Sequence, residues 1–486
     1  MRCPPSLLLL ALALALPTGA AAAPPPEGRC PARNAAPGAE PEVDSGGALV
    51  KEGESISLER LLQLRSLLPP EVWSFRDVFF YEGMRMEIGW CHRRYASAPF
   101  YAEATRAFAG QARLDEAGNL TGYTAGLPFP PEAIDGAAGD AAQRWAWNFE
   151  MRYRGAGPVG RFRLMDLPDR VGAPETYLGD FFLVKTGHRA DLAASDYRVP
   201  ESTRTSWVAG GKFVEPFGAR GLAWRQLRPR QAEADWSKPD DTFVYIPELR
   251  KSRRAASAWV DGIYTPRYRV AGQNDGGLVP FATGQGGEYA PGFQMLPTNA
   301  AKSIAATEDI RRGFMGLAIR PNAYRWSLVG EREVLAPLNG NAVGWPDQPD
   351  RNYGPWGLSM ASDRWDVRWA VVLRGVARKE IEGVAAITLW LDWQTQQPLY
   401  FMTQKKNGAL LDVGILVHRY SGDAVRYPAW PSSEPANVFD PVAAGFYFVP
   451  GRGSGWRRES YDVRSLPLEP SDLRKLTSTD ELQKGH

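Results

Sequence analysis

The feature that most limits the fold of this chain is a repeated alternation of apolar and polar residues with a period of two. It is clearest in residues 144–154 and 363–374. The apolar positions are Trp145, Trp147, Phe149, Met151, Tyr153, Trp365, Val367, Trp369, Val371 and Leu373. A strand with one apolar face and one solvent-exposed face is typical of antiparallel sheets. Strands of parallel sheets are usually buried on both faces and are therefore apolar along their whole length. We therefore predict a mainly β fold and interpret both segments as strands.

The later part of the chain predicts a β-meander, in which strands adjacent in sequence pair with each other. The expected strands are 363–375, 383–393, 398–405 and 409–420. Residues 406–409 (KNGA) suit a two-residue hairpin turn, since Asn and Gly tolerate positive φ. The 49 glycines and 40 prolines among 486 residues agree with many strands joined by turns.

Few helices are expected. Ser57 can cap a helix that runs to Leu68 and stops at the following prolines, and Pro99 can open a second one through about Phe108. A short helix is expected near 471–476. The Gly-rich stretch 272–300 is interpreted as a long loop. No break in composition divides the chain, which predicts a single β-rich domain over 51–466 and a tail over 467–486.

The first 23 residues have the pattern of a signal peptide: Arg2, then an apolar run of Leu and Ala, then small residues. A Pro-, Ala- and Gly-rich arm is predicted to follow over 24–50. Removal of the signal peptide also removes Cys3 and leaves two cysteines, Cys30 and Cys91. An even number of cysteines in an oxidising compartment suggests one disulfide between them. Two separate thiols are the alternative.

Several classes of function find no support in the sequence. Lys and Arg total 57 against 55 for Asp and Glu, so the formal net charge is only +2. The overall charge of the protein therefore does not favour binding to nucleic acid. The chain has four histidines and three cysteines, which provide few candidate ligands for a His/Cys metal site. Neither a Gly-x-Ser-x-Gly motif nor a phosphate-binding loop is present. We therefore expect no cofactor, no metal and no catalytic residues.

Two features leave alternatives open. Asp392 lies between Trp390 and Trp393, where a glycosidase carboxylate could sit beside sugar-stacking indoles, although an Asp facing water on a strand is the simpler interpretation. A basic run follows the strand that ends at Pro247. It is either a solvated rim or a docking rim for lipid phosphates or an acidic partner, and its residues are Arg250, Lys251, Arg253 and Arg254.

The aromatic stripe itself gives the main hypothesis. In a curved sheet such a stripe lines a groove that an apolar ligand can fill, whereas in a plain sandwich it packs against a second sheet. The predicted groove residues are Trp145, Trp147, Phe149, Met151, Trp365, Trp369 and Trp393.

Several motifs together resemble a family of secreted bacterial proteins of unknown function, often labelled outer-membrane lipoprotein-sorting proteins, with a LolA/LolB-like fold. The matching segments are 122–130 (GYTAGLPFP), 145–150 (WAWNFE), 152–154 (RYR), 241–247 (DTFVYIP), 324–326 (YRW), 365–374 (WDVRWAVVLR), 389–392 (LWLD) and 399–400 (LY). The chain departs from the family pattern at Lys251 and Ser252, which interrupt the basic run, and at Asn339 to Asn341.

The resemblance implies a large curved antiparallel sheet, a LolA/LolB-like half-barrel with a few covering helices, in the periplasm of a Gram-negative bacterium. It implies a carrier of a lipid, a lipoprotein acyl group or another hydrophobe, working beside an inner-membrane exporter and an outer-membrane protein. It provides no catalytic residues. The alternatives are a secreted hydrolase of polysaccharide or lipid, and a non-catalytic scaffold of an export complex.

Overall fold

The computed structural model describes residues 50–167, 174–192, 204–247, 250–254, 263, 314, 316–341, 351–381, 383–424, 436–449, 455–465 and 468–483. The predicted signal peptide, all but the last residue of the predicted arm, and the predicted loop 272–300 lie outside these ranges. These three assignments stay predictions.

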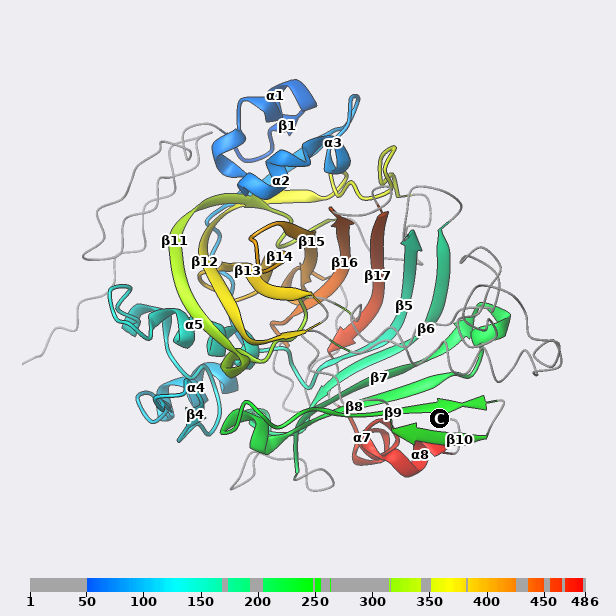
Figure 1. Ribbon diagram of the computed structural model, residues 1–486. Coiled ribbons are helices and arrows are strands. Elements are labelled where there is room, and N and C mark those ends of the chain that lie inside the picture. Colours follow the sequence, from blue (N-terminus) through cyan, green and yellow to red (C-terminus); the bar gives the residue numbers. More distant parts are fainter. Residues whose placement is uncertain are drawn as a thin grey trace, which may run out of the picture.

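Fifteen strands form one open sheet (Figure 1), in the hydrogen-bonded order β1-β2-β12-β13-β14-β15-β16-β17-β5-β6-β7-β8-β9-β10, with β11 also paired to β12. Only β2 and β12 pair in parallel; the other described pairs of this sheet are antiparallel. Its strands are β1 Ser55–Ile56, β2 Met86–Cys91, β5 Pro158–Leu167, β6 Glu175–Lys185, β7 Thr205–Glu215, β8 Ala223–Pro229, β9 Asp241–Ile246, β10 Lys251–Arg254, β11 Tyr324–Ala336, β12 Arg364–Ile381, β13 Val384–Asp392, β14 Pro398–Gln404, β15 Leu410–Tyr420, β16 Phe439–Phe448 and β17 Gly455–Ser465. A separate two-stranded ladder joins β3 Arg113–Leu114 to β4 Leu120–Thr121. The prediction of a mainly β, largely antiparallel fold is confirmed.

The predicted meander is also confirmed, because β12, β13, β14 and β15 pair in sequence order. The turn between β14 and β15 is closed by a 2.8 Å hydrogen bond from Lys405 N to the Ala409 carbonyl. Only Gly408 has a positive φ there, at 82°. Asn407 contributes instead through its side chain, whose Oδ1 accepts from Ala409 N at 3.1 Å.

Within the described ranges, seven short α-helices lie around the sheet: α1 Leu58–Leu62, α2 Pro70–Ser74, α3 Arg76–Phe79, α4 Pro99–Ala107, α5 Ala141–Met151, α7 Pro470–Thr477 and α8 Thr479–Gln483. The predicted cap is confirmed, since Ser57 Oγ accepts from Arg60 N at 3.3 Å. The first helix nevertheless ends at Leu62 instead of Leu68, and Pro70 opens a new helix, because a proline at the first helical position removes only an N–H that would be unpaired anyway. The helices expected from Pro99 and near 471–476 are present. Among the described residues, no helix has both the length and the apolar character needed to cross a membrane.

The predicted strand over residues 144–154 is wrong, because this segment forms the helix α5. Helical spacing places Trp145 and Phe149 on one side, and Trp147 and Met151 on another. All four side chains are buried, as are Asn148 and Glu150 between them. Only Gln143 and Arg144 of this helix are half-buried and its other residues are buried, so little polar face remains. Its apolar residues therefore matched a period of two as well as a period of 3.6.

The sheet curves around α5. Trp145 lies 6.1 Å, between ring centroids, from Trp393 just after β13, whereas Glu150 accepts a 2.9 Å hydrogen bond from Trp207 Nε1 on β7. In a flat sheet the order from β13 to β7 would span about 34 Å at about 4.8 Å for each strand. Five helical residues rise only about 8 Å. Since one short helix contacts both strands, the face toward α5 is concave.

Two apolar clusters lie on opposite faces of this sheet, and neighbouring residues of β12 and β14 point alternately into one and the other. We call the concave one the inner cluster; it includes Trp145, Phe149, Phe162, Phe181, Trp207, Trp224, Phe314, Leu317, Leu373, Leu389, Phe401, Phe446 and Tyr461. The outer cluster includes Leu61, Val72, Phe79, Met86, Leu335, Trp365, Val372, Trp390, Tyr400 and Ile415. The outer cluster packs under α1, α2 and α3, while α7 covers the outer face of β6 and β7 (Figure 1).

Replacing Phe149 by Ala tests the packing of α5 inside the curved sheet. We expect the free energy of unfolding to fall by about 3–5 kcal/mol, because a fully buried ring leaves a cavity. The matched control is Phe217→Ala, since that ring is 86% exposed, and its effect should stay within about 0.5 kcal/mol. Urea unfolding followed by tryptophan fluorescence measures both. Equal effects of the two changes would contradict the central position of α5.

Candidate functional site

The predicted groove residues do not share one surface. Trp145 and Phe149 belong to the inner cluster, and Trp393 packs against it. Trp147 and Met151 belong to a smaller cluster on the other side of α5, where Trp147 Nε1 donates to the Gly118 carbonyl at 2.9 Å. The structure therefore brings three of the seven residues together on the concave face.

The two tryptophans predicted from β12 also separate. Trp365 is buried in the outer cluster, and its Nε1 donates to the Met360 carbonyl at 2.9 Å. Trp369 is half-buried, with Nε1 donating to Glu331 Oε2 at 2.7 Å. Strand parity alone could not assign them, because Val367 also faces the outer cluster while Val371 faces the inner one. A ligand-binding role for the seven residues stays a prediction.

Asp392 does not face water, contrary to the simpler of the two interpretations. It is fully buried, and its two oxygens accept from Arg368 Nε and Nη2 at 2.7 and 3.2 Å. The side chain and backbone of Thr395 donate to the same carboxylate. With these donors around it, the Asp392 carboxylate holds the end of β13 in place.

The basic run forms the edge strand β10 and the residue before it. Lys251, Arg253 and Arg254 are exposed, as is Arg250. Arg254 forms an ion pair with Asp241 on β9. Docking on this rim stays a prediction. Cys91 forms a disulfide, while Cys30 lies outside the described residues, so their pairing also stays a prediction.

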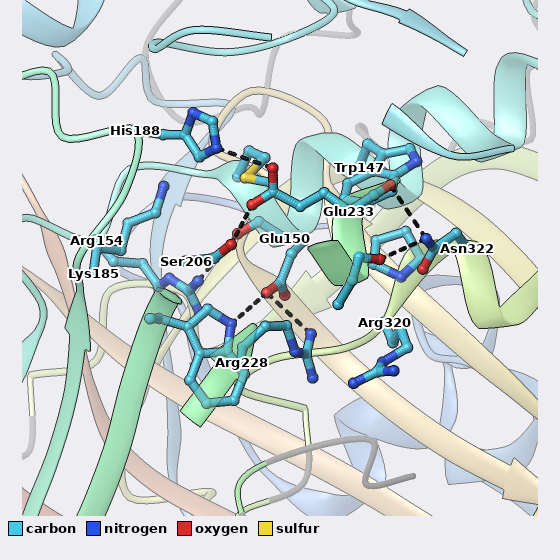
Figure 2. Close-up of a pocket in the computed structure, with 14 residues that line it drawn as sticks. Trp147, Glu150, Arg154, Lys185, His188, Ser206, Arg228, Glu233, Arg320 and Asn322 are labelled. Carbon is cyan, nitrogen blue, oxygen red and sulfur yellow. Dashed lines mark hydrogen bonds and ion pairs between the residues drawn. The ribbon is translucent and has the colours of Figure 1, made fainter. Parts of the chain in front are cut away.

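A small cavity bordered by charged residues lies at the C-terminal end of α5, and sequence reasoning missed it (Figure 2). Its charged residues come from four stretches far apart in sequence: Glu150 and Arg154, Lys185 of β6, Arg228 and Glu233, and Arg320. Trp147 and Trp207 form apolar walls. The cavity is large enough for a water molecule or a similarly compact polar group.

Glu150 is the first of two buried carboxylates at this cavity. Its Oε1 accepts from Trp207 Nε1 at 2.9 Å and from Arg228 Nη1 at 3.5 Å. Its Oε2 accepts from Ile319 N at 3.1 Å. Three donors from β7, β8 and the segment before β11 thus converge on one side chain of α5, which ties the helix to both parts of the sheet.

Glu233 is the second buried carboxylate. It accepts from His188 Nε2 at 3.0 Å and from the Ser206 hydroxyl. Burial opposes its ionisation, but His188 and these hydrogen bonds outweigh burial and lower the pKa of Glu233. His188 Nδ1 faces the Thr124 carbonyl at 2.7 Å, so both ring nitrogens face acceptors. The contact between His188 Nε2 and Glu233 connects the segment just after β6 to the 3₁₀ turn after β8.

A third carboxylate, Asp240, holds the arginines behind the cavity. It pairs with Arg228 Nε at 3.0 Å and with Arg320 Nη2, and Gln226 donates to it at 2.8 Å. Burial raises the pKa of Asp240, but the two guanidinium groups outweigh burial and lower it. Arg228 and Arg320 are thus neutralised by Asp240 and Glu150.

Two buried cations at the cavity have no carboxylate partner. Arg154 donates to the carbonyls of Leu317 and Glu150 at 3.0 and 3.1 Å. Lys185 is 6% exposed, and among the described residues its ammonium has no hydrogen bond or ion pair. Burial, followed by the positive charge of Arg154, lowers the pKa of Lys185 to about 7, although Glu150 opposes this.

This arrangement supports ion binding better than nucleophilic chemistry. The Ser206 hydroxyl donates to the Glu233 carboxylate, and this serine does not lie in a Gly-x-Ser-x-Gly motif. Within the described part of the chain, no group of three or more His, Cys, Asp or Glu side chains could hold a metal ion. What remains is a small cavity bordered by two uncompensated positive charges.

One signal in the sequence could have located Lys185. Phe181 and Leu183 point into the inner cluster, so period-two alternation places Lys185 on the same buried face. An ammonium at the end of an apolar strand face is uncommon, because a buried charge needs a counter-charge. Glu233, His188 and Arg320 had no such local signal, since their proximity depends on the curvature of the sheet.

Comparison with known families identifies part of the chain. Residues 63–271 match the family DUF1329. Its description is "Protein of unknown function (DUF1329)". The family resemblance drawn from the sequence motifs is confirmed. The DUF1329 segment contains α5 and the cavity residues Glu150, Arg154, Lys185, Arg228 and Glu233; Arg320 lies beyond it.

Solved structures similar to this chain are distant in sequence. A DUF1329 family protein from Desulfovibrio piger is 12% identical, covers 70% of this chain and 96% of its own, and has a TM-score of 0.37. A putative outer membrane lipoprotein-sorting protein domain from Vibrio parahaemolyticus is 13% identical, with 68% and 92% covered and a TM-score of 0.35. A LolA superfamily protein from Nitrosomonas europaea is 13% identical, with 70% and 98% covered and a TM-score of 0.32. No curated protein matches the chain.

The depressed pKa of Lys185 predicts a pH-dependent stability. Between about pH 7 and 10 the unfolded lysine binds a proton that the folded one has lost, so Lys185 makes the protein more stable as pH rises through this range. Lys185→Met removes the buried charge and should stabilise the protein more at pH 6 than at pH 9, by a difference on the order of 2 kcal/mol. Urea unfolding of both proteins at the two pH values measures it. The same gain at both values would show that Lys185 titrates normally.

Proposed function

We propose that this protein is a non-catalytic carrier that binds a lipid, a lipoprotein acyl group or another hydrophobe inside its curved sheet. The observation that supports this most directly is the inner cluster. Apolar side chains cover the concave face from β12 across to β9, and no second sheet packs on them among the described residues. A helix and a short segment cover this face instead.

The helix is α5 and the segment contains Phe314 and residues 317–319. Phe314 lies 5.3 Å from Phe162, 4.7 Å from Phe181 and 5.8 Å from Tyr461, between ring centroids. In this structure, the protein's own rings therefore fill the concave face. Binding requires the ligand to displace them, and an acyl chain could offset that cost because burial is worth about 0.8 kcal/mol for each CH₂ group.

The setting of this carrier is part of the proposal. The predicted signal peptide supports a periplasmic protein of a Gram-negative bacterium. The exposed basic rim Arg250, Lys251, Arg253 and Arg254 offers a surface on which an exporter or an outer-membrane protein could dock. A hydrolase has less support, because Asp392 and Ser206 are both committed to partners within the protein.

Phe314→Ala tests the proposed interior. Removing this ring leaves room in the inner cluster, so the fluorescent fatty acid 11-(dansylamino)undecanoic acid should bind about tenfold tighter than to the native protein, because it fills a cavity instead of displacing a packed ring. Dansyl fluorescence on titration measures the affinity. Native mass spectrometry of the protein purified from periplasm, followed by lipid extraction, identifies the natural ligand.

The matched control is Phe79→Ala, which removes an equally buried ring from the outer cluster. It should leave the affinity for the fatty acid unchanged. If the native protein binds no fatty acid and carries no lipid, or if both variants gain affinity equally, the concave face is not the binding site.

A further inference from the structure

The cavity at the C-terminal end of α5 contains more positive than negative charge. Glu150 and Asp240 neutralise Arg228 and Arg320, and Glu233 pairs with His188. Arg154 and Lys185 remain without a carboxylate. All of these groups except the partly exposed Glu233 are buried, so water screens the excess charge only weakly.

Lys185 is the group with capacity left to bind something. The guanidinium of Arg154 already donates to two carbonyls, whereas the ammonium of Lys185 has no partner among the described residues. Figure 2 shows the Lys185 side chain at the border of the cavity, next to Arg154. An unpaired ammonium in an almost fully buried position is expensive unless a counter-ion joins it.

We propose that this cavity binds a compact oxyanion, a carboxylate or a phosphate group, through the ammonium of Lys185 with Arg154 beside it. Neither carboxylate of the cavity makes a hydrogen bond or an ion pair with the Lys185 ammonium among the described residues, although the charges of Glu150 and Glu233 both act on it. The size of the cavity suits one such group and excludes an acyl chain.

This inference deepens the proposed function. It rests on that function where it assigns the anion to the end of a ligand whose chain lies on the concave face. Trp207 lines the cavity and also belongs to the inner cluster. An amphiphile could therefore place its anionic end at Lys185 and its chain against the concave face. The same chemistry would fit a free small anion, and the experiment must distinguish these two sources.

Binding should depend on pH in a defined direction. The groups that face Lys185 are Arg154, Arg189, Glu150 and Glu233, and the last two are the only carboxylates that act on it appreciably. Because the pKa of Lys185 lies at about 7, the free protein holds the proton below that pH and has lost it above. An anion binds the protonated form, so affinity should fall about tenfold for each pH unit above 7, and binding at pH 8 should take up about one proton.

The experiment is isothermal titration calorimetry with octanoate, acetate and neutral 1-octanol at pH 6 and pH 8. Two amine buffers of different ionisation enthalpy report the proton uptake, which needs no variant. Inorganic phosphate is titrated at pH 6 for affinity alone, since its own proton equilibrium obscures the uptake. Lys185→Met should weaken octanoate binding at pH 6 at least tenfold, while Lys406→Met, an exposed turn lysine, should not change it.

The outcomes separate the two proposals. Octanoate binding with proton uptake that Lys185→Met abolishes supports the inference, with a headgroup as the source. The same behaviour for acetate or phosphate without any gain from the longer chain supports a free anion as the source and counts against the carrier. Binding of octanoate and 1-octanol that is equal in the native protein and Lys185→Met, without proton uptake, overturns the anion site and leaves the carrier intact. No binding of any anion at millimolar concentration also overturns it.

Discussion

The curvature of the sheet is the constraint on which the other features depend. A concave apolar face must be covered, and α5 covers it while contacting strands that are far apart in the sheet order. Most of a helix in that position is shielded from solvent, so its polar residues Asn148 and Glu150 are buried. Glu150 and Asn148 consequently need partners inside the protein. Asn148 exchanges hydrogen bonds with the backbone of Phe129, and Glu150 joins the network of β7 and β8.

Strand alternation made much of the sheet predictable. Each strand of the meander from β12 to β15 has one face toward the outer cluster and one toward the inner cluster, and the turns between them are short. The helix caps at Ser57 and Pro99 depend on neighbouring residues alone, and local chemistry predicts these well. The helix α5 was misassigned because the burial of nearly all its residues left too little of the polar face that normally reveals the helical period.

The cavity at the C-terminal end of α5 could not be predicted from local pattern. Glu150 and Arg320 are 170 positions apart, and they meet only because the sheet bends. Lys185 alone among the charged residues of the cavity could have been noticed in the sequence, because alternation along β6 places its charge on the apolar face of that strand. Most of the charged lining belongs to the DUF1329 segment, and Arg320 is supplied from later in the chain. The cavity thus depends on contacts between the DUF1329 segment and the segment just before β11.

The sheet order begins at β1 and ends at β10 without closing on itself. In a closed barrel, widening the interior requires breaking a ladder of hydrogen bonds, because every strand has neighbours on both sides. Here the same widening can be distributed as small changes of twist over the thirteen interfaces between successive strands of this order. For the proposed carrier, an open sheet therefore offers a way to admit a ligand on its concave side without unfolding any strand.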